Sequence, residues 1–345
     1  MIYIEPSVEL IDEKDNFKRI ERAGRVSYKS EDKITEDSAY PFFQRICKRG
    51  HTSVIEHSVL FVVTHNPETT AWLRYLLEEY SSGAGHPHYI RYSPWVTSDC
   101  DTYLPVHRDL DIPLGVVVGN EYLFSGNLRA WRNVAERYKN EQLLSFLFKE
   151  HSVFTDIFEK ADMCASGIYT HDDVEIVDSI PTDPDEYEFA YLHNIATMHI
   201  IADRGVIDEY ARHRVFAHTI ESTRYVNYED KGITFVFPFW FKDVKNDPKI
   251  GSVGGTFGNT CYSAEVAYHE IMNKTNTPQI ARGALPLWVK SEHMMTGTIQ
   301  QWIDLLKLRD SPAAHPDAQK IAKMIERVLV EEVWVKDIWG VKNND

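Results

Sequence analysis

The sequence contains few cysteines, and none lies close to another. The four are Cys47, Cys100, Cys164 and Cys261, and they form no Cys-x-x-Cys pair. This spacing argues against a zinc site and against a disulfide framework, and it fits a reducing cytoplasm. No apolar run approaches the roughly 18 residues of a membrane span. The N-terminus has no basic region followed by an apolar one, which predicts no signal peptide. We therefore expect a cytoplasmic protein without a membrane partner.

Positive charge is also scarce. The chain has 37 Lys and Arg against 52 Asp and Glu, which gives a net charge of −15 at pH 7. This excess of acid argues against non-specific nucleic-acid binding. The 345 residues, 43% of them hydrophobic and 26% charged, suit one large soluble domain or a domain with a large insertion. In such a chain, a local cluster of arginines is informative.

The clearest cluster of arginines lies in residues 210–225, which read Tyr-Ala-Arg-His-Arg-Val-Phe-Ala-His-Thr-Ile-Glu-Ser-Thr-Arg-Tyr. Arginine is almost never fully buried without a partner, and its planar fork fits phosphate or carboxylate oxygens two at a time. The hydroxyls and backbone N–H groups near Ser222 could complete an anion site. On composition alone, a solvated and salt-bridged surface turn explains the segment equally well.

Hydrophobic spacing and breaker residues predict a coarse order of elements. We expect helices over 8–23, 38–49, 68–80, 127–138, 203–214, 260–273, 277–286, 296–309 and 317–336, and strands over 58–65, 115–124 and 195–203. Gly50 stands where a helix C-cap glycine belongs. Residues 251–258 are rich in glycine but lack the Lys-Ser/Thr ending of a phosphate loop, so we expect a flexible loop there.

The order of residues in the arginine cluster resembles the signature of the flavin-dependent thymidylate synthases. Arg212-His-Arg214, seven residues and then Ser222-Thr-Arg224-Tyr225 match Arg-His-Arg-x7-Ser with a trailing Arg-Tyr. Other segments resemble the same family: Ala23-Gly-Arg-Val-Ser27, Gly50-His51 through Ser53 to Glu56-His57, Ala281-Arg282 to Leu285-Pro286, and 296–309. The resemblance covers about 1–65 and 195–330.

The chain departs from the family pattern at a few positions. Thr219-Ile220 replace the usual Asn-Glu, and the acid, Glu221, comes one residue later. Ala217 replaces a serine, Gln300 a flavin-contacting arginine, and Asp304 an asparagine. These changes bear more on the flavin contacts than on the nucleotide contacts.

The resemblance implies reductive methylation of dUMP to dTMP, with methylenetetrahydrofolate as carbon donor and NADPH-reduced FAD as hydride source. It also implies an α+β fold: a twisted, mostly antiparallel sheet flanked by helices, in a single domain over 1–345. Residues 66–190 are then a large insertion whose role the sequence does not indicate. The family assembles as a homotetramer whose sites are shared between subunits, and we expect the same here.

The resemblance also assigns site residues. For dUMP it implies Glu209, Arg212, Glu221, Ser222, Thr223, Arg224, Arg282 and Arg309, with Arg309 also catalytic. For FAD it implies Ser27, His51, Ser53, Glu56, Arg212, His213, Arg214, Thr298, Gln300 and Asp304. Chemically, cations and hydroxyls suit a dianionic phosphate, and a fixed guanidinium can stabilise negative charge that develops on the uracil ring. Such flavin chemistry needs no cysteine nucleophile and no metal.

Two other functions remain open. A non-catalytic nucleotide-binding module would keep Arg224 and Arg282 but would not need the flavin contacts, and flavin absorbance of the purified protein would distinguish it. A metal hydrolase could use His51, His57, His213 and His218, although no standard ligand spacing is present. His86 and His88 are a weaker metal candidate, because they lie in a breaker-rich segment without a carboxylate or cysteine pattern.

Overall fold

The computed structural model describes residues 1–84, 90–94, 121–139, 141–148, 151–158, 173–182, 184, 186, 189–229, 232–243, 248–333 and 335. The chain divides into two compact units, one of Met1–Val54 with Ala196–Asp345 and one of Ile55–Ile195. Both contain antiparallel strands flanked by helices, so the α+β prediction is confirmed. The second unit contains residues 66–190. That these residues are an insertion into a single domain stays a prediction.

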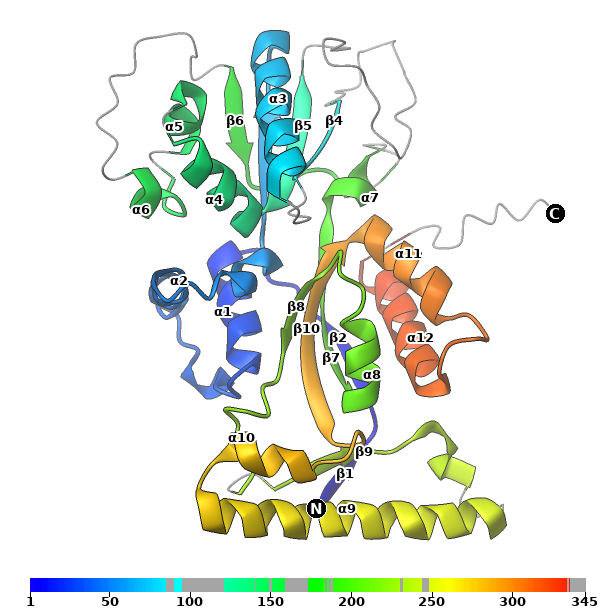
Figure 1. Cartoon of the computed structure of the whole chain (residues 1–345). Helices are drawn as coiled ribbons and strands as arrows, with labels where there is room; N and C mark the ends of the chain where they lie inside the picture. Colours follow the sequence, from blue (N-terminus) through cyan, green and yellow to red (C-terminus); the bar gives the residue numbers. More distant parts are fainter. Residues whose placement is uncertain are drawn as a thin grey trace, which may run out of the picture. The chain divides into compact units, whose positions relative to one another are not determined.

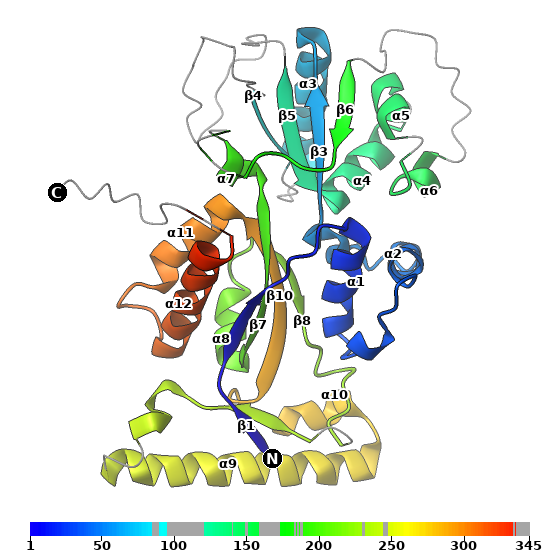
Figure 2. The same ribbon diagram turned by 180° about the vertical axis from the view of Figure 1, so that it is seen from behind.

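The first unit is built on a sheet in which β10 is an inner strand. The strands follow the order β2 (Ser7–Leu10), β7 (Ile195–Asp203), β10 (Lys290–Thr298) and β8 (Ala217–Ile220). Helix α1 (Asn16–Val26) lies on one side of the sheet, and α8 (Arg204–Tyr210), α11 (Ile299–Arg309) and α12 (Pro316–Glu331) lie on the other (Figures 1 and 2). Every residue of β10 is therefore buried.

A second layer of this unit contains α9 (Pro248–Thr275), which lies across the sheet end where β10 begins (Figure 1). Beside it are the parallel pair β1 (Ile2–Ile4) and β9 (Thr234–Val236), η3 (Phe239–Asp243), α10 (Pro278–Ala281) and η4 (Arg282–Ala284). The expected loop over 251–258 is wrong, because these residues lie inside α9. Phe257, Cys261 and Tyr268 recur at helical spacing and are buried, and this burial outweighs the roughly 1 kcal/mol that each glycine costs in a helix.

Three other predicted boundaries are wrong. The expected helix over 8–23 is instead β2 followed by α1, which begins where the Asp15 carboxylate accepts from the N–H groups of Phe17 and Lys18 at 2.8 and 3.1 Å. The expected helix over 203–214 ends at Tyr210. Residues 296–298 belong to β10, and α11 begins only after Thr298, whose side chain forms a capping box with Gln301.

Other elements agree with their predictions. Helix α2 (Ala39–Lys48) ends at Gly50, which adopts φ 71°. The N–H groups of Gly50 and His51 close the helix end by donating to the carbonyl groups of Cys47 and Ile46. Strand β7 follows the prediction over 195–203, and α12 lies within the predicted 317–336 apart from its first residue. The predicted helix over 277–286 is two short turns, α10 and η4.

The second unit has an antiparallel sheet in the order β4 (Ile90–Pro94), β5 (Tyr122–Asn127), β3 (Val59–Thr64) and β6 (Val174–Val177). Its helices are α3 (Pro67–Ala84), α4 (Leu128–Arg137), α5 (Gln142–Phe148), α6 (Thr155–Phe158) and α7 (Ala190–His193). Phe61 and Val63 pack against Ile180 and Ala190. The predictions over 58–65, 68–80 and 127–138 are confirmed. Of the strand expected over 115–124, only the part from Tyr122 is confirmed, since 115–120 lie outside the described residues.

Candidate functional site

The Arg212–Arg214 segment is a turn between α8 and β8. Asp203 caps α8 by accepting from the N–H of Val206 at 3.0 Å. After Tyr210 the chain leaves the helix, and Phe216 packs edge-on against Trp302 with ring centroids 4.6 Å apart. Phe216 directly precedes β8, so Arg212 and His213 lie on the turn between the two elements rather than in the helix predicted over 203–214.

Arg309, at the end of α11, makes three directed hydrogen bonds to this region. Its Nη1 donates to Oε2 of Glu209 at 2.8 Å and its Nη2 donates to the backbone carbonyl of Glu209 at 2.7 Å. Its Nε donates to Nε2 of His213 at 2.8 Å. The side chain is 18% exposed. The charge of this side chain is therefore partly desolvated. Because a guanidinium has five N–H donors, two remain for another acceptor.

The imidazole of His213 is neutral in this arrangement, since its Nε2 accepts a hydrogen bond from the Nε–H of Arg309. Burial lowers the pKa of His213 to about 4, and the positive charge of Arg309 adds to the effect. Nε2 of His218 donates to the backbone carbonyl of His213 at 2.9 Å, because a carbonyl can only accept. Nδ1 of His218 therefore accepts from Nε2 of His293, also at 2.9 Å. These bonds fix the turn on which His213 lies.

Four other arginines that the sequence singles out have a different environment. Arg212, Arg214, Arg224 and Arg282 are exposed, and among the described residues no carboxylate lies within ion-pair distance of them. The guanidinium of Arg224 lies 5.1 Å from the ring centroid of Tyr225. Exposed cations without a carboxylate partner are available for an anionic ligand, which favours a binding role over the salt-bridged surface turn.

Ser222 and Ser27, which come from distant parts of the sequence, are neighbours. The N–H of Ser222 donates to the carbonyl of Ser27 at 3.0 Å, and its side-chain oxygen accepts from the N–H of Arg224 at 3.4 Å. Ser222 and Thr223 are half-buried. The structure thus joins the end of α1, where a flavin contact is predicted, to the turn where the phosphate contacts are predicted.

Glu221 lies inside the protein. Its side chain is fully buried, with Oε2 2.8 Å from Nζ of Lys290 and Oε1 accepting from the hydroxyl of Tyr228 at 2.8 Å. Lys290 also pairs with Glu292, to which Lys29 and His199 are bonded as well. Sequence reasoning missed this cluster. The available signal was Lys290-x-Glu292, which places two charges on one face of a strand.

Three predicted flavin contacts, Thr298 at the N-cap of α11 and Gln300 and Asp304 within it, are bonded to one another or to the backbone. Thr298 accepts from the N–H of Gln301 at 3.3 Å as part of its capping box. Gln300 donates to Asp304 at 3.2 Å, and Lys307 donates to the same carboxylate oxygen at 3.2 Å. The two departures from the family pattern, Gln300 and Asp304, therefore contact each other.

The predicted contacts in 51–56 belong to two units. His51 and Ser53 are exposed in the first unit, whereas Glu56 belongs to the second and pairs with Arg129. Burial raises the pKa of Glu56, although the hydrogen bond from Arg129 opposes this effect. That these residues and the Arg212–Arg214 turn contact the same flavin stays a prediction.

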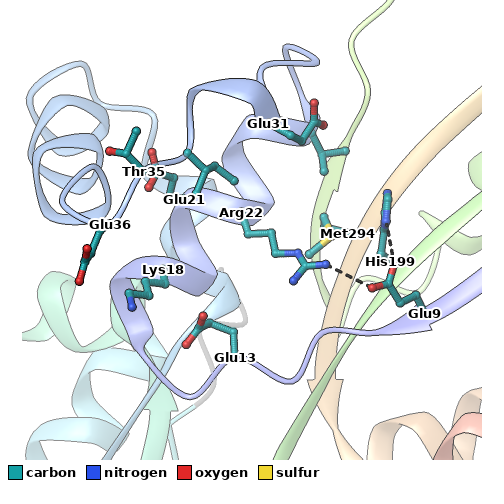
Figure 3. A pocket seen from close by; sticks show the side chains of 12 residues that line it. Glu9, Glu13, Lys18, Glu21, Arg22, Glu31, Thr35, Glu36, His199 and Met294 are labelled. Carbon is teal, nitrogen blue, oxygen red and sulfur yellow. Dashed lines mark hydrogen bonds and ion pairs between the residues drawn. The ribbon is translucent and has the colours of Figure 1, made fainter.

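A cavity of about 610 Å³ lies among α1, the segment 31–36 and the strands β2, β7 and β10 (Figure 3). Its lining includes Glu9, Glu13, Glu31 and Glu36, and Figure 3 shows Arg22 directed at Glu9 beside His199. No residue predicted to bind nucleotide or flavin lines it. An acidic lining of this kind would repel a phosphate, so the cavity is distinct from the predicted site.

The described residues also bear on the alternative functions. No group of three or more His, Cys, Asp or Glu in the described part of the chain is placed to hold a metal ion. His86 and His88, like Cys100 and Cys164, lie outside the described residues. Cys261 is buried, and burial raises the pKa of its thiol to about 11, which suits a core residue rather than a nucleophile. No helix within the described ranges is long and apolar enough to cross a membrane.

Comparison with known proteins gives two matches in this region. The family model described as Thymidylate synthase complementing protein matches residues 190–333. The "Probable flavin-dependent thymidylate synthase" of Mycobacterium phage L5 is 27% identical over 151 residues, which are 41% of this chain and 61% of that relative. The chain thus spans 61% of the relative's length. The family match includes Glu209, His213 and Arg309 but not Ser27 or His51. Both comparisons confirm that this chain resembles the flavin-dependent thymidylate synthases, as the Arg-His-Arg-x7-Ser motif indicates.

Proposed function

We propose that this protein is a flavin-dependent thymidylate synthase, which methylates dUMP reductively to dTMP. Methylenetetrahydrofolate supplies the carbon, and FAD reduced by NADPH supplies the hydride. The observation that supports this most directly is the environment of Arg309. Its guanidinium is held by Glu209 and by the His213 of the family motif, and it keeps two N–H donors for a ligand. A fixed donor of this kind suits a ring that gains negative charge during reaction.

The proposed contacts to dUMP separate by charge. The dianionic phosphate is bound by the hydroxyls of Ser222 and Thr223 and by Arg224 and Arg282. The two guanidinium groups are exposed and have no carboxylate partner among the described residues. The uracil carbonyl oxygens accept hydrogen bonds from Arg309, whose orientation Glu209 and His213 fix. This contact withdraws electron density as charge develops on the ring oxygen, so Arg309 acts mainly on the transition state.

The residues of the motif also fit a flavin. FAD carries a pyrophosphate, and Arg212 and Arg214 are exposed cations without a carboxylate partner in the described part of the chain. The remainder of the cofactor is contacted by polar side chains from other segments. These are Ser27, His51, Ser53, Glu56, Thr298, Gln300 and Asp304. When bound, the flavin supplies the hydride, and the protein orients it against the substrate. We propose that NADPH and the folate enter as co-substrates of the same site.

The site is proposed to be completed by a second subunit in a homotetramer. The motivation is that His51 and Ser53, predicted flavin contacts, lie on a segment separate from the Arg212–Arg214 turn. Purified protein should then bind FAD as an oligomer and lose it when dilution separates the subunits. Light scattering combined with flavin absorbance tests this, and monomers that hold FAD at full occupancy would contradict it.

The decisive experiment is tritium release from dUMP labelled at C5, with and without NADPH and added FAD. We expect release that depends on both, and dTMP as product. Protein that binds dUMP but has no flavin absorbance and releases no tritium would instead be the non-catalytic nucleotide-binding module. Metal analysis of the same preparation tests the hydrolase alternative.

A further inference from the structure

The buried cluster beside Ser222 contains two carboxylates and two ammonium groups. Glu221 pairs with Lys290 at 2.8 Å, and Lys290 also donates to Glu292 at 2.6 Å. The second ammonium, that of Lys29, pairs with Glu292, and Nε2 of His199 lies 3.1 Å from the other Glu292 oxygen. Burial alone would raise the pKa of Glu292, but the bonds from His199, Lys290 and Lys29 outweigh it and hold that pKa far below its ordinary value. The cluster is therefore a balanced set of charges.

Backbone hydrogen bonds tie the same residues to the Ser222–Arg224 turn. The N–H of Glu221 donates to the carbonyl of Glu292 at 2.8 Å, and the N–H of Ser222 donates to the carbonyl of Ser27 at 3.0 Å. Lys29, two residues after Ser27, adopts φ 52°, which is uncommon for a residue with a side chain. Its ammonium group is the one that pairs with Glu292. Strand β10 and the end of α1 thus hold the turn from two directions.

We propose that Lys290 is a positioning residue, which fixes the Ser222–Arg224 turn through the Glu221 carboxylate so that it can receive the phosphate of a nucleotide. Glu221 then contributes to dUMP binding without touching dUMP, because its side chain is fully buried, with Oε2 ion-paired to Lys290 and Oε1 bonded to Tyr228. The proposal rests on the proposed function, since it takes Ser222 and Arg224 to be phosphate ligands. It adds a group on β10 that neither the motif nor the comparisons assign.

Two substitutions distinguish positioning from mere stability. Lys290→Met leaves the buried Glu221 carboxylate without its cation, so Glu221 must take up a proton or move. In either case it loses its contact with Lys290, and we expect the Ser222–Arg224 turn to be held less firmly. Lys290→Met combined with Glu221→Gln removes both charges. The tyrosine hydroxyl can still donate to the glutamine oxygen, so the double variant should recover thermal stability. It should not recover dUMP binding, because a methionine at position 290 cannot hydrogen-bond the glutamine side chain at position 221.

The readouts are the KM for dUMP, kcat, the melting temperature and the Kd of dUMP from calorimetry. We expect both variants to raise KM and Kd by about tenfold or more and to change kcat by less than about threefold, on the scale of lost ground-state binding. The matched control is Lys320→Met. That lysine forms a 2.6 Å ion pair with Glu5 at the surface, and its loss should change none of the four quantities.

Several outcomes would overturn the proposal. If the double variant regains the wild-type KM together with its melting temperature, Lys290 serves stability alone. If Lys290→Met folds and binds dUMP as the wild type does, the turn needs no anchor. Both results require wild-type protein that makes dTMP, so they leave the proposed function intact. Wild-type protein that neither binds dUMP nor makes dTMP would remove the proposed function and this inference together.

Discussion

Replacing Arg309 by lysine keeps a positive charge at the end of α11 but removes the planar fork. In the structure the guanidinium donates to Oε2 of Glu209, to the backbone carbonyl of Glu209 and to Nε2 of His213, at 2.8, 2.7 and 2.8 Å. A lysine ammonium has three donors on one nitrogen. It can pair with the carboxylate of Glu209, but it cannot also reach His213 and direct a donor at the substrate.

The expected loss follows from these contacts. Two of the three directed bonds are lost, which at about 1 kcal/mol each lowers the free energy of unfolding by about 2 kcal/mol. The donor that we propose for the uracil ring is lost as well. Removing one preorganised donor to a developing negative charge costs about 2.7–4 kcal/mol in the transition state, so kcat should fall on the order of 10²-fold or more. The effect should appear in kcat, because charge on the ring grows only during reaction.

Single-turnover flavin oxidation and dUMP titration of the flavin absorbance measure chemistry and binding separately. Arg282→Lys is the matched variant: it should raise KM for dUMP with a smaller change in kcat, because a phosphate contact acts already in the ground state. The reasoning is refuted if Arg309→Lys turns over normally and only binds dUMP more weakly. Arg309 would then be a phosphate ligand, and the group that activates the ring would be another residue.

Three other predictions concern single side chains. Alanine at Cys47, Cys100, Cys164 or Cys261 should leave dTMP synthesis intact, and loss of turnover in a variant that folds and binds flavin would contradict this. Ser222→Ala should lower dUMP affinity and keep measurable turnover, because holding a phosphate demands less than activating a serine; no turnover at saturating dUMP with binding intact would indicate a nucleophile. For His213, whose folded pKa of about 4 lies below its ordinary 6.5, the unfolded chain binds the extra proton, so its stabilisation is complete above pH 6.5 and is lost as the pH falls towards 4. His213→Gln should therefore show a smaller fall in melting temperature between pH 7 and pH 4.5, and equal falls would refute the assignment.

The sequence predicted local features well where one neighbouring stretch determines them. The end of α2 needed only a glycine after an amphipathic run, and Gly50 adopts the left-handed conformation that this position requires. Strand β10 was missed because its own residues do not show the pattern of a strand. All its residues are buried, so it lacks the polar and apolar alternation of a half-exposed strand, and Lys290 and Glu292 suggest solvent rather than core.

The buried cluster shows why the remainder of the site could not be predicted. Glu221 and Lys290 are far apart in sequence, and so are Lys29 and Glu292. No periodicity joins such pairs, because the sheet order β7-β10-β8 and the position of α1 bring them together. The motif singled out Arg212, Ser222 and Arg224, but it gave no indication that Glu221 points inward while its neighbours remain exposed or half-buried.

The distribution of carboxylates around the arginines favours one orientation of dUMP. Glu209 lies 2.8 Å from Arg309 and largely neutralises its charge, so a dianionic phosphate would gain little there and would be repelled by the same carboxylate. A neutral uracil carbonyl has no such penalty, and it can accept from the two donors that Glu209 and His213 leave. Arg224 and Arg282 have no carboxylate partner among the described residues, so a phosphate at either one breaks no ion pair there. We therefore propose that the uracil ring binds at the paired arginine and the phosphate at the unpaired ones.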